Sequence, residues 1–137
     1  MSSFPTPRKS EAADKPRLLI ADDDTVVRSA LAQQLAGHFE LVGAARDAAE
    51  AVELAAAQKP DIAILDVEMP AGGGPHAARG IAAISPSTTI VALSIDESRD
   101  VVLEMLDAGA VTYVRKGAGG RHLIDTLLHC IHATGRA

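Results

Sequence analysis

The chain has 137 residues, the length of one ordinary domain, and its hydrophobic content of 47% is enough for a single apolar core. Aromatic residues make up only 2% and the formal net charge is -5, which argues against a surface that binds nucleic acid or stacks on flat ligands. Cys130 is the single cysteine, so an internal disulfide is excluded, and no apolar run reaches the roughly 20 residues of a membrane span. We therefore expect a cytoplasmic protein with neither nucleic acid nor membrane among its direct partners.

From Arg17 onward, short apolar runs alternate with longer segments of helical periodicity. Residues 1–16 carry too little apolar surface to become ordered, so we predict a disordered tail there, a domain over 17–133, and a tail or the start of a linker over 134–137. Strands are predicted at 18–21, 41–45, 62–65, 89–93 and 111–114, and helices at 26–35, 47–57, from Pro75 onward, at 101–106 and at 123–131.

Five strand-helix units in strict alternation predict an α/β fold, a doubly wound five-stranded parallel sheet with helices on both faces. The strands are apolar at nearly every position, as expected for strands that are buried on both sides. Right-handed connections bring the carboxyl ends of all strands to one edge of the sheet, where folds of this kind place their functional site. Polar residues that end the strands are therefore the first candidates for function.

The polar strand ends carry three acids, a hydroxyl and a lysine: Asp22 and Asp23, then Asp66, Ser94 and Lys116. With the strand order 2-1-3-4-5, the first and third strands are neighbours and the acid pair lies beside Asp66. Carboxylates about 4 Å apart repel by roughly 4 kcal/mol per pair at an effective dielectric constant near 20, so such a cluster needs protons or cations. A hard divalent ion such as Mg²⁺ and the lysine are the natural partners.

Together these residues resemble the receiver domain of bacterial two-component response regulators, over about residues 17–132. The resemblance implies the flavodoxin-like strand order 2-1-3-4-5 with five helices. It rests on the acid pair Asp22-Asp23, on Asp66 within Leu-Asp-Val-Glu-Met-Pro, on Ser94 after the fourth strand, and on Tyr113 three residues before Lys116.

The resemblance implies that Asp66 accepts a phosphoryl group from a histidine of a partner histidine kinase or phosphotransfer protein. It also implies Mg²⁺ as cofactor, held by Asp23, Asp66 and the main-chain carbonyl of Glu68, with Asp22 contributing through water bound to the ion. The expected activity is that of a signalling switch, and any catalysis is limited to self-directed phosphotransfer and autodephosphorylation.

The same resemblance implies how the signal leaves the site. Lys116 pairs with the phosphoryl group, and Ser94 moves inward to donate a hydrogen bond to it. This movement vacates space for the ring of Tyr113, so the face formed by the fourth helix, the fifth strand and the fifth helix changes. That face is expected to contact an output domain or a second copy of the chain.

Several positions depart from the usual family pattern, and two of these departures concern the backbone around the site. Gly117 follows Lys116 where many members have proline in a cis bond, and we predict a trans bond because a cis bond without proline costs about 2.5–4 kcal/mol. Three consecutive glycines, Gly72 to Gly74, follow the third strand, and we predict a pliant loop over residues 69–74.

Two alternative functions remain open. Asp22-x-Asp24-x-Val26 after an apolar strand also resembles the opening motif of haloacid-dehalogenase-type phosphatases, with Ser94 and Lys116 as later elements. That interpretation leaves Asp66 without a role, and we assign Asp24 to capping the first helix instead. A receiver-like interaction module that works without phosphorylation is the other alternative, and it predicts no millimolar Mg²⁺ binding.

Overall fold

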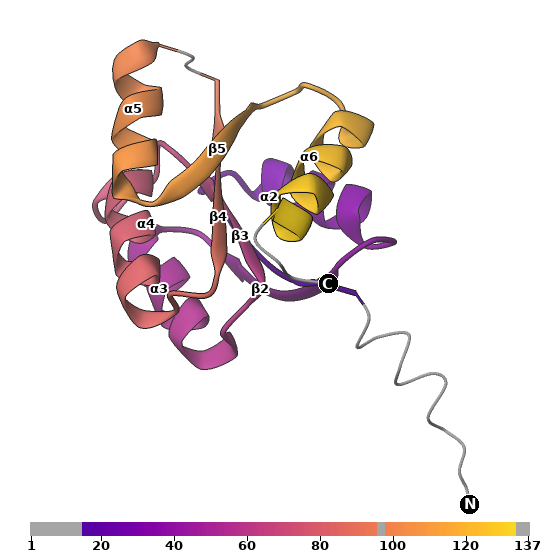
Figure 1. The fold of residues 1–137 in the computed structure, drawn as a ribbon, viewed down its shortest axis with the longest axis horizontal. Helices are drawn as coiled ribbons and strands as arrows, with labels where there is room; N and C mark the ends of the chain where they lie inside the picture. The colour runs from indigo at the N-terminus through magenta and orange to yellow at the C-terminus, as the bar shows by residue number, and fades with distance from the viewer. Residues whose placement is uncertain (1–14, 96–97, 134–137) are drawn as a thin grey trace, which may run out of the picture.

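The computed structural model describes residues 15–95 and 98–133, and these form five strands and five helices (Figure 1). Residues 1–14 and 134–137 of the predicted tails lie outside the described residues. In chain order the elements are β1 Arg17–Ala21, α2 Thr25–Leu35, β2 Glu40–Ala45, α3 Ala48–Gln58, β3 Ile62–Asp66, α4 Gly73–Ile84, β4 Thr89–Ser94, α5 Arg99–Ala108, β5 Ala110–Arg115 and α6 Gly120–Ala133.

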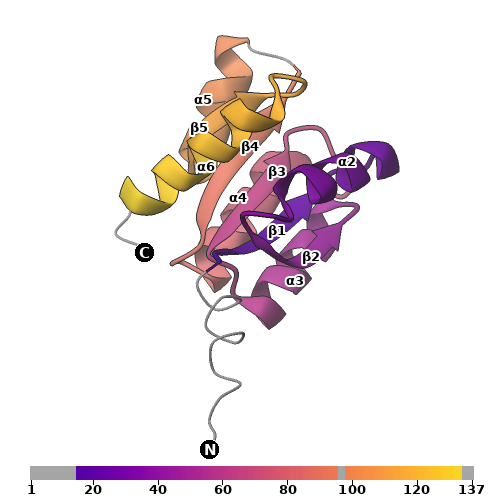
Figure 2. The same cartoon turned by 90° about the vertical axis from the view of Figure 1, so that its right-hand side faces the viewer.

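The strands form one parallel sheet in the order β2-β1-β3-β4-β5, which confirms the predicted fold class. Helices α3, α4 and α5 cover one face of the sheet, and α2 and α6 cover the other (Figures 1 and 2). Each face has its own apolar core. No helix in the described ranges combines the length and apolar character needed to cross a bilayer.

Side-chain caps start the helices that follow β1 and β2. Asp24 caps α2, since its carboxylate accepts hydrogen bonds from the main-chain N–H groups of Val26 and Val27 at 2.8 and 3.4 Å. At α3, Asp47 accepts a hydrogen bond from the Glu50 N–H at 2.8 Å. The cap at Asp24 matters for the site, because it fixes the chain direction directly after the acid pair.

The glycine-rich segment after β3 was predicted as a loop through Gly74, and this prediction is wrong at its end. Helix α4 already begins at Gly73, and the Gly74 N–H donates a hydrogen bond to the Val67 carbonyl at 2.8 Å. Gly74 is buried, and a Cβ atom there would lie 2.7 Å from the carbonyl oxygen of Asp66 and 2.8 Å from the Cα of Val67. The glycine is therefore required so that the helix can start against the end of the third strand.

Gly74→Ala is expected to lower the free energy of unfolding by about 2 kcal/mol, because the added methyl group meets backbone atoms that cannot move aside as a side chain could. Gly37→Ala is the matched control, since a Cβ at Gly37 has no neighbour within 4 Å. Urea unfolding of both variants measures the difference. Equal stabilities of the two variants would show that the start of α4 shifts without cost.

Candidate functional site

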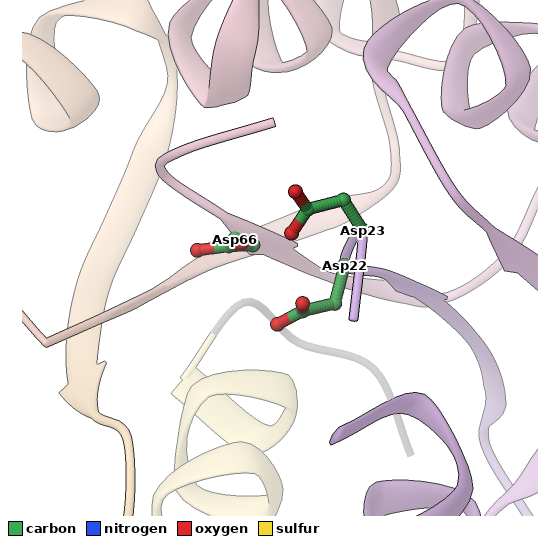
Figure 3. Close-up of side chains that lie close together, drawn as sticks. All are labelled: Asp22, Asp23 and Asp66. Carbon is green, nitrogen blue, oxygen red and sulfur yellow. The ribbon is translucent and has the colours of Figure 1, made fainter. Parts of the chain in front are cut away.

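Three carboxylates meet where β1 and β3 end. The two strands are neighbours with Ala21 opposite Leu65, so Asp22 and Asp23 emerge beside Asp66. One carboxylate oxygen from each acid lies within 4.8 Å of the others (Figure 3). Asp22 and Asp66 are buried, with 0% and 3% of their surfaces exposed, whereas Asp23 is exposed. The predicted convergence of the acids is thus observed.

Lys116 reaches this cluster from the far side of β4. Its main-chain N–H donates a hydrogen bond to the Ser94 carbonyl at 3.0 Å, which continues the pairing of β4 and β5 one residue beyond the strand. Its Nζ lies 2.9 Å from Oδ2 of Asp22 and 3.3 Å from Oδ1 of Asp66. Burial opposes a charge on Lys116, but the two carboxylates outweigh this effect and raise its pKa, so the ammonium stays protonated at neutral pH.

The surroundings of Asp66 alter its titration. Burial raises its pKa from 3.8 to about 6, and the neighbouring Asp22 carboxylate adds to the rise. The Lys116 ammonium and the Glu68 N–H, which donates to Oδ1 at 3.3 Å, act in the opposite direction. Keeping the Asp66 carboxylate ionised in this pocket therefore costs free energy, and an additional cation would reduce that cost.

The donor set fits a hard divalent cation. Three ionised carboxylates and one ammonium give a formal charge of -2. Oδ2 of Asp22 is buried, and its partner within the described ranges is the Lys116 ammonium 2.9 Å away, so one monovalent cation faces three carboxylates. Carboxylate oxygens are the ligands that Mg²⁺ takes in proteins, usually one or two together with water. Neither the ligand set nor the part of the Glu68 carbonyl is fixed by this fit, and both stay predictions.

Ser94 ends β4 beside the pocket, and Tyr113 lies in the neighbouring strand β5. Ser94 is the last residue of β4 and is 3% exposed, one position beyond Leu93, which pairs with Asp66. Tyr113 lies in β5 opposite Ala92, is half-buried, and packs on the core that α3, α4 and α5 share. Their movement as a switch stays a prediction.

Two further observations concern the rim of the pocket. The described backbone contains no cis peptide bond, so the predicted trans bond between Lys116 and Gly117 is confirmed.

Arg28 was not predicted from the sequence to lie near the site. Its guanidinium donates a hydrogen bond to the Asp22 carbonyl at 2.7 Å. An arginine one turn into the first helix carries no local signal of that contact.

A cavity of about 240 Å³ adjoins Lys116 on the face of α2 and α6. Its lining is mostly aliphatic, and Val26 at its edge is 75% exposed. The side chains and backbone around it come from α2, from the ends of β4 and β5, from the loop 116–119 and from the start of α6. An apolar surface thus lies next to the charged pocket.

Residues 18–128 match the family model of the response regulator receiver domain. The chain belongs to this family. The receiver domain is 44% identical over 110 residues to the transcriptional regulatory protein PdtaR of Mycobacterium tuberculosis, which covers 78% of this chain and 52% of PdtaR. It is 33% identical over 113 residues to the response regulator GacA of Pseudomonas viridiflava, covering 81% and 53% of the two chains. The receiver domain therefore spans about half the length of these relatives.

Solved structures show the same fold. The response regulator domain of Thermotoga maritima CheB is similar with a TM-score of 0.75 and 30% identity, covering 88% of this chain and 96% of that domain. A two-component response regulator of the LuxR family from Aurantimonas sp. SI85-9A1 gives a TM-score of 0.82 at 26% identity, covering 90% and 88%. Family membership places the receiver domain in two-component signalling and argues against the haloacid-dehalogenase alternative.

Proposed function

We propose that this receiver domain accepts a phosphoryl group on Asp66 from a phosphohistidine of a histidine kinase or phosphotransfer protein, in a Mg²⁺-dependent reaction. The observation that carries the proposal is the arrangement of charge around Asp66. Its buried carboxylate lies 3.3 Å from the Lys116 ammonium, in a cluster of three acids that each place one oxygen within 4.8 Å of the others.

In the proposed reaction a carboxylate oxygen of Asp66 attacks phosphorus, the phosphorus–nitrogen bond to the donor imidazole breaks, and that nitrogen keeps the electron pair. The product is an acyl phosphate on Asp66. Lys116 holds positive charge next to the incoming phosphoryl oxygens, and it offsets their charge effectively because the acceptor Asp66 is only 3% exposed. Asp23, Asp66 and the main-chain carbonyl of Glu68 would hold Mg²⁺, with Asp22 acting through metal-bound water. When bound, the ion supplies the positive charge that lets two anions approach each other.

The donor is proposed to dock over the cavity beside Lys116. A phosphohistidine has to come within bonding distance of Asp66, and this cavity is an apolar surface that adjoins the pocket. Val26 at its edge offers a side chain that a partner can cover.

The proposed output is a change on the face of α5, β5 and α6. Ser94 would donate a hydrogen bond to a phosphoryl oxygen, and Tyr113 would follow into the space that Ser94 leaves. Leu103, Leu106 and Val111 expose 51%, 39% and 48% of their surfaces on α5 and β5, so this face offers apolar contacts to an output domain or a second copy. The relatives are about twice as long as the matched stretch, which supports regulation of a further domain.

The function is tested by labelling with phosphoramidate, a small donor whose phosphorus–nitrogen bond mimics phosphohistidine and which needs no cognate kinase. We expect labelling to rise to about one phosphoryl group per chain with Mg²⁺ and to stay at background in a chelator. Release of many phosphates per chain would indicate a phosphatase. Absence of both labelling and millimolar Mg²⁺ binding would favour the interaction module that works without phosphorylation.

A further inference from the structure

The turn that carries the acid pair is fixed by hydrogen bonds around Asp22. The Asp22 N–H donates to the Ala45 carbonyl at 3.0 Å, and its Oδ1 accepts from the Asp24 N–H at 2.9 Å. The Asp22 carbonyl oxygen lies one residue beyond β1 and accepts a hydrogen bond from Nη1 of Arg28 at 2.7 Å. Helix α2 holds the guanidinium in turn, because Nη2 donates to Thr25 Oγ1 at 3.2 Å.

Asp23 depends on this turn more than the other two acids do. Asp22 and Asp66 are buried and pair with Lys116, whereas Asp23 is exposed and forms no ion pair within the described part of the chain. The Asp22 carbonyl and the Asp23 N–H belong to one planar peptide unit. The hydrogen bond from Arg28 therefore fixes the plane from which the Asp23 side chain projects towards Asp66 (Figure 3).

We propose that Arg28 is a positioning residue of the cation site, which holds the Asp22-Asp23 peptide so that the Asp23 carboxylate is pre-organised for Mg²⁺. The inference rests on the proposed function, since it takes Asp23 as a ligand. Groups that orient a metal ligand without touching the metal commonly change metal affinity by about 10- to 100-fold.

The charge of Arg28 and its hydrogen bond to the Asp22 carbonyl predict opposite changes in Mg²⁺ affinity when Arg28 is replaced by a neutral residue. A guanidinium near an acidic pocket opposes the binding of a cation, so its charge alone predicts tighter Mg²⁺ binding once it is removed. Its role in holding the peptide predicts weaker binding. The sign of the change therefore separates the two effects.

The test is calorimetric titration of Mg²⁺ into the wild type, Arg28→Met, Arg28→Lys and the control Arg79→Met. We expect a Kd about tenfold higher for Arg28→Met. Arg28→Lys should recover part of the affinity, because an ammonium can still donate one hydrogen bond to the Asp22 carbonyl. Arg79→Met should bind as the wild type does, since the Arg79 side chain is 55% exposed on α4. Equal or tighter binding by Arg28→Met would overturn the proposal.

Mg²⁺ binding by the wild type distinguishes a failure of the proposed function from a failure of Arg28 positioning. A wild type that binds no Mg²⁺ in the millimolar range refutes the proposed function and Arg28 positioning together. A wild type that binds Mg²⁺ while Arg28→Met binds equally well refutes only the role of Arg28. Urea unfolding in a chelator establishes that Arg28→Met is folded. Should it not fold, Thr25→Val removes one anchor of the guanidinium and keeps its charge, and unchanged Mg²⁺ affinity in that variant would refute the positioning role.

Discussion

Asp66→Asn is expected to abolish phosphoryl acceptance and, at the same time, to make the metal-free domain more stable. Function is lost because the amide oxygen is a poor nucleophile and carries no charge to share with Mg²⁺. Stability is gained because burial and the Asp22 carboxylate raise the pKa of Asp66 to about 6, so the folded state disfavours its ionised form. A shift of two pKa units corresponds to about 3 kcal/mol, and screening at the open rim of the pocket reduces the expected gain to about 1–2 kcal/mol.

The stability gained by Asp66→Asn is expected to decrease as the pH falls. Between pH 3.8 and about 6 the folded wild type binds a proton that the unfolded chain lacks. The wild type therefore gains stability relative to the variant as the pH falls from 7 to 4, and the advantage of the variant disappears. Urea unfolding at several pH values, in the presence of a chelator, measures this difference.

Asp107→Asn is the matched control for both readouts, because Asp107 lies near the end of α5 with 84% of its side chain exposed. It should be labelled as the wild type is and should unfold at the same urea concentration. Labelling of Asp66→Asn at the wild-type level would place the acceptor elsewhere. A variant less stable than the wild type at pH 7 would contradict the electrostatic account of the pocket.

Lys116→Met is expected to have the opposite effect on stability and to impair phosphoryl acceptance as well. The ammonium is the charge partner of the fully buried Asp22, and removing one member of a buried pair leaves a charge without compensation. Since 21% of the Lys116 side chain is exposed, we expect a loss of about 2–3 kcal/mol in the metal-free protein. Phosphoryl acceptance should fall about 100-fold, because one preorganised positive group next to the reacting oxygens is gone.

Mg²⁺ should reduce the stability loss of Lys116→Met, since the ion supplies positive charge to the same acids. Unfolding with and without Mg²⁺, together with the initial rate of labelling, measures both effects. Arg121→Met serves as the control, because it removes an exposed cation from the first turn of α6. A Lys116→Met protein as stable as this control in a chelator would contradict the role of Lys116 as the charge partner of the buried acids.

The sequence was sufficient to predict the sheet and the convergence of the three acids at its edge. Continuous apolar runs that end in polar residues predict parallel strands with a common functional edge, and Asp22, Asp23 and Asp66 do converge there. Gly74 could not be predicted in this way, because a run of glycines suggests a loop while the need for a glycine comes from the Asp66 carbonyl 2.7 Å from its absent Cβ. The contact of Arg28 with the Asp22 carbonyl also depends on how the helix leaves the strand.

The parallel sheet separates two apolar cores that share only its backbone. Met105 and Ala108 belong to the core under α3, α4 and α5, whereas Leu127 and Ile131 belong to the core under α2 and α6. A substitution that repacks one side therefore leaves the contacts on the other side intact. It follows that apolar side chains in one helical layer can be exchanged without matching exchanges in the other layer.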